Sequence, residues 1–198
     1  MIAFTPKAYQ RRLLDSVAAY FDACHETQSP GRAFTDVTDA LWQRAQPYRS
    51  LPGFPADMPY FCLRVPTGGG KTWLAAKSVA LVNTRLLRVE RSVILWLVPS
   101  SAIRDQTLKA MRDRSHPVHA ALREAGPVEV LDLDAAKSVT RATLDTHTTV
   151  IVTTRQAFQR DEPESLKAYQ SSGALMHHFD NLSETQRTHL LTEGEGGD

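Results

Sequence analysis

The alternation of apolar and polar positions divides the middle of the chain into short strands separated by helices. Runs rich in β-branched and aromatic residues predict strands at residues 60–65, 92–98, 128–133 and 148–153. Three of these runs are almost continuously apolar, as expected for strands buried on both faces. Helical spacing of apolar residues predicts the intervening helices, at 71–89, 102–113 and 118–124. Because strands that alternate with helices form a parallel sheet covered on both faces, the pattern predicts a three-layer α/β fold.

The two ends of the chain lack this regular alternation. Residues 6–24 place apolar positions along one helical face, and an irregular stretch with a short predicted helix at 35–46 follows. The C-terminal end has helical spacing at 164–179 and 183–191. We therefore expect three parts: an N-terminal helix and irregular excursion at 1–58, a core at 59–160 and an acidic helical tail at 161–198.

Composition narrows the class of protein further. The 198 residues are 42% hydrophobic and 23% charged, the balance of an ordinary globular chain, and no apolar run is long enough to span a bilayer. The N-terminus has no secretory signal, and Cys24 and Cys62 provide neither a disulfide framework nor a zinc-binding pair. We expect a cytoplasmic protein without a membrane partner.

Charge is unevenly distributed although the net charge is only +1. Residues 61–155 contain fourteen basic and eight acidic side chains, whereas residues 156–198 contain three basic and eight acidic ones. A basic middle followed by an acidic end suggests that the core faces a polyanion. Ordinary surface charge is the alternative explanation.

The strongest motif is the run VPTGGGKT, which lies between a predicted strand and a predicted helix. Consecutive glycines let the backbone turn so that several N–H groups point inward and bind phosphate, and the helix N-terminus adds partial positive charge. In this interpretation Lys71 reaches the β- and γ-phosphates of a nucleotide, and the Thr72 hydroxyl ligates Mg²⁺. The predicted cofactor-binding residues of this loop are Pro66, Thr67, Gly68, Gly69, Gly70, Lys71 and Thr72.

One position departs from the general phosphate-loop pattern G-x-x-x-x-G-K-[ST]. Val65 occupies the place of the first glycine. This argues against small-molecule kinases and GTPases, which generally keep that glycine.

With this loop, the chain resembles the superfamily 2 helicases and translocases, in which Pro-Thr-Gly commonly precedes Gly-Lys-Thr. It is most similar to the ATPase subunit of type III restriction enzymes. The resemblance covers about residues 1–160 through four motifs in the family order, and that order is more specific than any single motif. It implies a RecA-like domain that binds ATP and Mg²⁺.

The first of these motifs is Tyr9-Gln10. The resemblance implies that the Gln10 amide reads the adenine edge, because an amide offers both a donor and an acceptor. It also implies that Phe4 stacks on the base. The alternative for Gln10 is an ordinary glutamine on the helix surface.

Two further motifs follow the strands at 92–98 and 148–153. They resemble motifs Ia and Ib, which hold the nucleic-acid backbone in this family, and free N–H groups at a helix start are suited to phosphate. The implied nucleic-acid-binding residues are Pro99, Ser100, Ser101, Arg104, Thr153, Thr154 and Arg155. A capped helix without a ligand and solvated arginines are the alternatives.

Catalytic residues are missing from the pattern. No apolar run after residue 155 ends in the Asp-Glu pair that holds Mg²⁺ and orients water in this family, so we assign no catalytic residue and expect a motor domain cut off before that strand. The resemblance implies a DNA helicase or translocase, for example of a restriction or phage-defence system, working with the rest of the motor or with partner subunits. A non-catalytic nucleotide-binding module and a nucleic-acid-binding adaptor stay open as alternative functions.

His116 and His119 have ligand-like spacing, but no cysteine or carboxylate accompanies them, so no metal site is predicted there.

Overall fold

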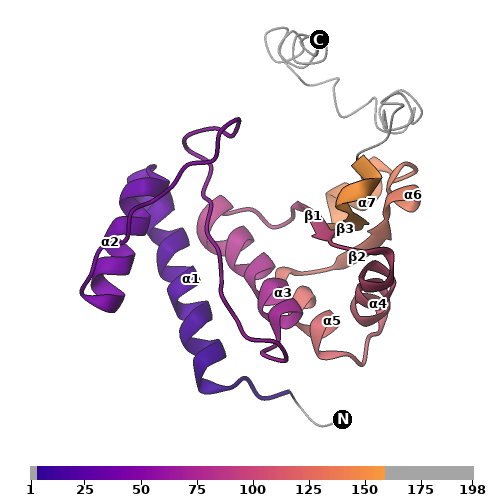
Figure 1. Ribbon diagram of the computed structural model, residues 1–198. Coiled ribbons are helices and arrows are strands. Elements are labelled where there is room, and N and C mark those ends of the chain that lie inside the picture. Colours follow the sequence, from indigo (N-terminus) through magenta and orange to yellow (C-terminus); the bar gives the residue numbers. More distant parts are fainter. Residues whose placement is uncertain (1–3, 159–198) are drawn as a thin grey trace, which may run out of the picture. The chain divides into compact units, whose positions relative to one another are not determined.

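The computed structural model describes residues 4–158, which form two units (Figure 1). Unit 1 comprises Met1–Ser92 and Lys109–Val128, and unit 2 comprises Val93–Leu108 and Glu129–Asp198. The helices predicted at 164–179 and 183–191 lie outside the described residues.

Unit 1 is organised around the long helix α1 (Ala8–Thr27). Its buried positions recur at helical spacing and include Val17, Phe21 and Cys24, so one face of the helix packs into a core. Burial also raises the pKa of the Cys24 thiol, because the thiolate would lose its hydration. The predicted helix at 6–24 is therefore confirmed, with its end three residues further along the chain.

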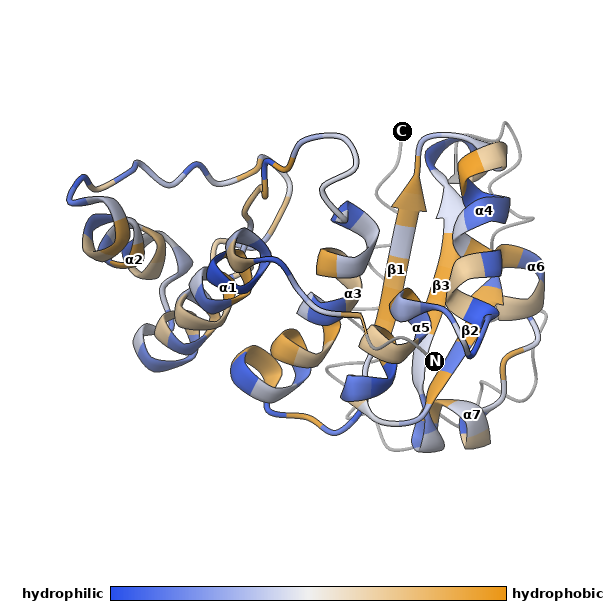
Figure 2. Ribbon diagram, turned by 90° about the horizontal axis from the view of Figure 1, so that it is seen from below, coloured by the Kyte–Doolittle hydropathy of each residue, from blue (hydrophilic) through white to orange (hydrophobic). Residues whose placement is uncertain are grey.

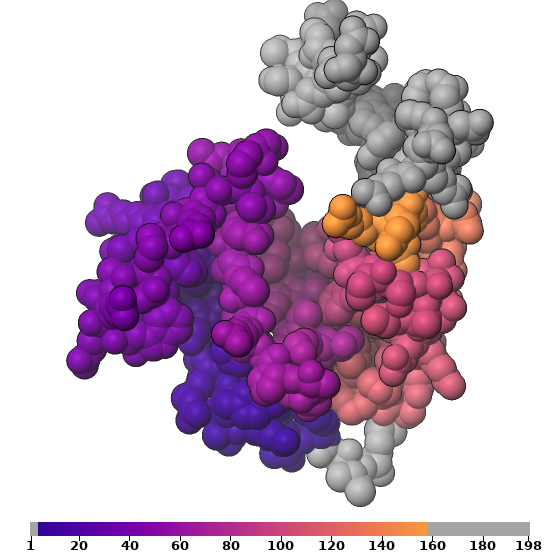
Figure 3. All heavy atoms as spheres, viewed as in Figure 1, coloured from indigo at the N-terminus to yellow at the C-terminus, as the bar shows by residue number. Residues whose placement is uncertain are grey.

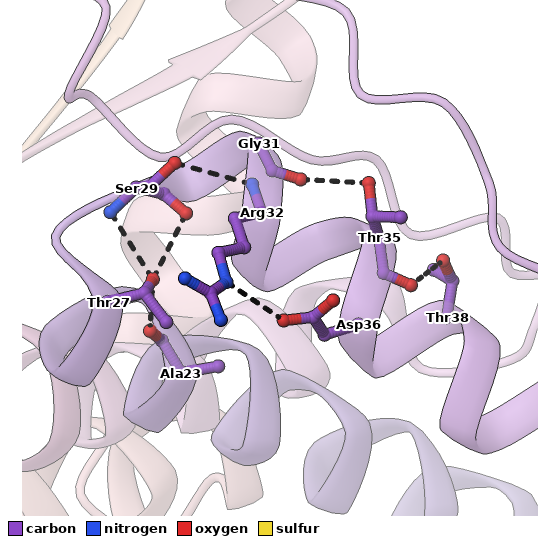
Figure 4. Close-up of polar contacts among 8 residues, drawn as sticks. All are labelled: Ala23, Thr27, Ser29, Gly31, Arg32, Thr35, Asp36 and Thr38. Carbon is purple, nitrogen blue, oxygen red and sulfur yellow. Dashed lines mark hydrogen bonds and ion pairs between the residues drawn. The ribbon is translucent and has the colours of Figure 1, made fainter.

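A short polar turn connects α1 to α2 (Pro30–Trp42) (Figure 4). Ser29 caps α2, because its hydroxyl accepts a hydrogen bond from the Arg32 N–H at 3.4 Å, and Pro30 occupies the first helical turn. The Thr27 hydroxyl donates to the Ala23 carbonyl at 2.7 Å and closes the end of α1. The helix predicted at 35–46 exists, but it starts earlier because this serine–proline pair sets its beginning.

The strand predicted at 60–65 is wrong. This segment has no regular secondary structure, and it pairs with no strand in the described part of the chain. Its apolar side chains pack on helices instead: the Phe61 ring lies 5.5 Å from Tyr20 and 5.6 Å from Phe21, and Leu63 joins the same cluster. An apolar run can favour a strand, but a strand also needs a neighbouring strand to pair with, and the local pattern does not contain that partner.

The helix after the phosphate loop is α3 (Lys71–Leu81), which continues as a π-helical turn, Val82–Leu87. It packs on α1 and on α5 (Pro117–Leu122), which is followed by a 3₁₀ turn, Arg123–Ala125. Leu74, 1% exposed, and Ala76, fully buried, are among the core residues of α3. The helices predicted at 71–89 and 118–124 are thus present, each with its last turn tightened or widened.

Unit 2 contains a parallel sheet in the order β1-β3-β2. The strands are β1 (Val93–Val98), β2 (Val128–Asp132) and β3 (Thr148–Thr154). β1 and β3 are parallel and in register from Val93 opposite Thr149 to Val98 opposite Thr154. The mixed α/β fold with a parallel sheet is confirmed, and it agrees with part of a RecA-like domain.

Further helical segments connect or follow these strands. Helix α4 (Ser101–Arg112) follows β1 and ends in unit 1, close to the predicted range 102–113. Two short helices, α6 (Leu133–Ala136) and α7 (Arg141–Thr146), lie between β2 and β3 and were not predicted. A 3₁₀ turn, Arg155–Phe158, ends the described residues. Both short helices are capped by polar side chains, those of Asp132 and Thr140, and have too few turns to show an apolar period.

The strands differ in how far they are buried. β3 is buried along most of its length, as its apolar middle predicts. Figure 2 shows hydrophobic, orange stretches along the strands. β1 instead exposes Val93, Leu95 and Leu97, each by more than half, and among the described strands it pairs only with β3. For β1 the expected burial on both faces is therefore wrong. None of the described helices is long and apolar enough to cross a membrane.

Candidate nucleotide site

The loop before α3 turns at two glycines with positive φ angles. Gly68 and Gly70 have φ angles of +76° and +81°, a region that side chains other than glycine rarely occupy. The Gly69 N–H donates to the Pro66 carbonyl at 3.0 Å and closes the turn. The first α3 bond then runs from the Leu74 N–H to the Gly70 carbonyl at 2.9 Å. The glycine-rich run thus forms a tight turn that leads directly into a helix.

The N–H groups at the start of α3 are available to a ligand. Within residues 4–158, Lys71, Thr72 and Trp73 donate no main-chain hydrogen bond, and no side chain caps the helix. These donors are the orphan N–H groups of a helix N-terminus, where the helix dipole favours an anion. The Lys71 ammonium pairs with no carboxylate in the described part of the chain, and the Thr72 side chain is exposed. The donor set therefore fits a polyphosphate.

Helix α1 holds the loop from the other side. The Tyr9 hydroxyl and the Gln10 Nε2 atom both donate to the Gly69 carbonyl, at 2.8 and 3.1 Å. Gln10 Oε1 accepts from the Lys7 N–H at 2.9 Å, so the same amide also closes the first turn of α1. In Figure 3 the indigo surface of the start of the chain adjoins the magenta surface of this loop. Gln10 is only 3% exposed, so the alternative of an ordinary surface glutamine is wrong.

A pocket of about 610 Å³ opens beside the loop, entirely within unit 1. The phosphate loop contributes Gly68, Gly70, Lys71 and Thr72, and α1 contributes Tyr9 and Gln10. The volume lies within the range of about 300–1,000 Å³ that is usual for small-molecule sites. A nucleotide is of the right size for such a pocket.

Two aromatic rings line the pocket. Phe4 lies with its ring 4.7 Å from that of Trp73, and Phe4 is 45% exposed whereas Trp73 is 6% exposed. The Lys77 ammonium lies 5.5 Å from the Trp73 indole centroid and 2.6 Å from Glu124 Oε2. Trp73 therefore contacts both Phe4 and Lys77 and is buried, whereas Phe4 keeps an exposed surface on which a base can stack. Of these two residues, sequence reasoning named Phe4 for stacking on the base.

His116 is a pocket residue that sequence reasoning missed. Its Nδ1 atom accepts a hydrogen bond from the Val118 N–H at 3.2 Å and caps α5, so the ring proton is assigned to Nε2. His119 instead places its Nδ1 atom 2.7 Å from the Met111 carbonyl. The two histidines thus have separate partners, and no cluster of three metal-binding side chains occurs among the described residues. Only the packing of α5 on α3, which no local pattern encodes, brings His116 to this pocket.

The residues implied to hold nucleic acid lie in unit 2. Pro99, Ser100 and Ser101 follow β1, and Arg155 follows β3. Because Val98 lies opposite Thr154 in the parallel sheet, the two groups meet at the same carboxyl edge. Separate motifs of the sequence therefore form one edge of one sheet.

The side chains at this edge are not equally available. Ser100 caps α4, accepting from the Ile103 N–H at 3.4 Å, and Arg104 pairs with Asp105 at 2.8 Å. Thr153 is 2% exposed, which leaves its hydroxyl out of reach of a ligand, whereas Arg155 is exposed. The cap on α4 and the exposed Arg155 are the features that suit a phosphate backbone.

Comparison with family models identifies the chain. The model of the family "Type III restriction enzyme, res subunit" matches residues 3–188, so the chain belongs to this family, whose members carry a helicase-like ATPase domain. Comparisons with curated proteins and with solved structures find no match. The resemblance inferred from four short motifs is confirmed over nearly the whole chain.

Proposed function

We propose that this member of the restriction-subunit family is the ATP-binding portion of a cytoplasmic, ATP-dependent DNA helicase or translocase. The observation that carries the proposal is the phosphate loop itself. Its glycines turn the backbone, the first N–H groups of α3 are free of main-chain acceptors, and Lys71 stands beside a pocket of about 610 Å³ without a described carboxylate partner. These are the requirements for holding a nucleoside triphosphate.

Each end of the pocket has its own task. At the phosphate end, the loop N–H groups and Lys71 hold the negative oxygens, and the Thr72 hydroxyl supplies one ligand to Mg²⁺. At the base end, Phe4 offers a stacking surface and Gln10 an amide. When bound, ATP with Mg²⁺ supplies the phosphoanhydride bond whose hydrolysis drives a motor of this family.

The carboxyl edge of the sheet in unit 2 is the proposed contact with DNA. It combines the start of α4, capped by Ser100, with the exposed Arg155 at the end of β3. Such contacts reach phosphates rather than bases, so they suit a protein that moves along DNA irrespective of its sequence. The surplus of basic residues in 61–155 supports this assignment.

Replacing Lys71 by alanine tests the nucleotide site. The substitution removes the full positive charge from the phosphate end and leaves an exposed helix position that alanine tolerates well. We expect isothermal titration calorimetry to show at least a tenfold weaker affinity for ATP, about 1.4 kcal/mol. Lys137→Ala is the matched control, because Lys137 pairs with Asp134 in unit 2 and should leave the affinity unchanged. Unaltered ATP binding by Lys71→Ala would refute the proposed site.

A further inference from the structure

We propose that Tyr9 is a positioning residue for phosphate binding, which it controls through its hydrogen bond with the Gly69 carbonyl. The proposal rests on the nucleotide site proposed above and extends it to a side chain outside the phosphate loop. Tyr9 belongs to α1 and lies 60 positions before Gly69, so the contact is purely tertiary. The Tyr9 hydroxyl donates to Gly69 at 2.8 Å, shorter than the 3.1 Å bond from Gln10.

The hydrogen bond fixes the orientation of one peptide group. In a trans peptide the carbonyl and the following N–H point in opposite directions, and no cis peptide occurs in the described chain. When Tyr9 and Gln10 hold the Gly69 carbonyl against α1, the Gly70 N–H must therefore point away from α1. That N–H donates to no main-chain carbonyl among residues 4–158, and Gly70 lines the pocket. Rotation of this peptide would put a carbonyl, which repels phosphate, where a donor is needed.

The surroundings leave the loop little freedom except this rotation. A Cβ atom on Gly69 would lie 2.5 Å from Val65 Cγ1 and 2.9 Å from the Pro66 carbonyl oxygen. A Cβ on Gly70 would lie 2.6 Å from Gln10 Nε2. Gly69 and Gly70 are thus packed as closely as glycine permits, but glycines rotate more readily than other residues, and the tether from α1 limits that rotation.

The Gly69 carbonyl has two donors, which makes their contributions interdependent. Gly69 is buried, so removing one donor leaves the carbonyl satisfied by the other, whereas removing both leaves a buried acceptor unpaired. Removing both donors should therefore cost more binding free energy at the phosphate site than the two single removals added together. A general weakening of the fold would not produce this signature at the phosphate site.

The test compares Tyr9→Phe with Tyr48→Phe in the full chain. Both substitutions remove one phenolic hydroxyl that donates to a main-chain carbonyl, from Tyr9 to Gly69 or from Tyr48 to Met58 at 3.1 Å, and both keep the ring. The ligands in calorimetry are ATP and inorganic tripolyphosphate, which has no base. We expect Tyr9→Phe to weaken both ligands by the same factor, about 3- to 10-fold, and Tyr48→Phe to weaken neither.

Two additional measurements separate positioning from stability. Gln10→Ala should also weaken tripolyphosphate, and the double variant with Tyr9→Phe should lose more than the product of the single factors. The Gly70 amide signal in a ¹H–¹⁵N NMR spectrum should shift in Tyr9→Phe and respond less to tripolyphosphate than in the wild type.

The outcomes distinguish this inference from the proposed function. If wild-type protein binds neither ATP nor tripolyphosphate, the nucleotide site itself is wrong and the role of Tyr9 falls with it. If the wild type binds both and Tyr9→Phe binds tripolyphosphate equally well, the site stands and only the positioning role is overturned. An equal loss in Tyr48→Phe would assign the effect to general destabilisation and would likewise overturn it.

Discussion

The Gln10 amide has enough hydrogen-bonding capacity for two tasks. A glutamine side chain offers two donors and two acceptor lone pairs, and the structure uses one of each, for Gly69 and Lys7. One donor and one acceptor are left for a ligand in the pocket. Gln10 can therefore hold the phosphate loop and read a base at the same time. The sequence, through the resemblance, indicated only the second task, because the contact with Gly69 joins residues 59 positions apart.

Replacing Gln10 by alanine should separate these tasks. Loss of the tether should weaken ATP and GTP equally, whereas loss of the remaining donor and acceptor should narrow the preference for ATP over GTP. Calorimetry with both nucleotides measures the ratio, and Gln46→Ala, which removes an amide outside the pocket, is the control. An unchanged ratio with lower affinities would leave Gln10 with the tether alone.

At the scale of the elements, local pattern predicted what local interactions determine. The helices α1 and α3 and the strands β1 and β3 lie close to their expected positions, because their apolar periodicity extends over several turns or pleats. The predictions that failed concern segments whose structure depends on distant residues or segments too short to show a periodic pattern. Segment 60–65 forms no strand and packs on α1 through Phe61, and the four-residue helix α6 is too short to show a period.

The reactivity of the two cysteines tests the packing of segment 60–65 on α1. Cys24 is buried in α1 with a raised thiol pKa, so a smaller fraction is thiolate at any given pH, whereas Cys62 is exposed in segment 60–65. At neutral pH in native buffer, a chromogenic disulfide reagent should label Cys62 at least tenfold faster than Cys24. The absorbance of the released group measures both rates. Cys62→Ser should remove the fast phase.

Two fast labelling phases in the native protein would contradict this prediction, because they would mean that α1 does not pack as described. Both thiols should react at similar rates once the protein is unfolded in denaturant, which confirms that the difference comes from the fold. If Cys62 reacted slowly, another part of the chain would have to cover segment 60–65.

At the scale of the whole molecule, the two candidate sites occupy different units. The nucleotide pocket lies in unit 1, and the edge formed by the ends of β1 and β3 lies in unit 2. The motif order in the sequence predicted both, because short motifs encode local chemistry. It did not predict His116 or the tether from Tyr9, which arise where distant segments of unit 1 pack together. The sequence therefore predicted the motifs, but not the residues from distant segments that pack against them.

The 198-residue chain should bind ATP without hydrolysing it. Binding needs the loop N–H groups, Lys71 and the start of α3, which the structure brings together. Turnover needs in addition a carboxylate to hold Mg²⁺, another to orient the attacking water, and positive charge on the γ-phosphate. No apolar run after residue 155 ends in Asp-Glu, and an arginine finger alone is worth about 10³–10⁵ in rate.

The rate of phosphate release from ATP, measured with and without single- and double-stranded DNA, should therefore stay at the level of the Lys71→Ala variant. Any DNA binding by the same chain should weaken steeply with added salt, because its contacts are phosphates. DNA-stimulated phosphate release that Lys71→Ala abolishes would contradict the prediction, since it would require a catalytic carboxylate within these residues.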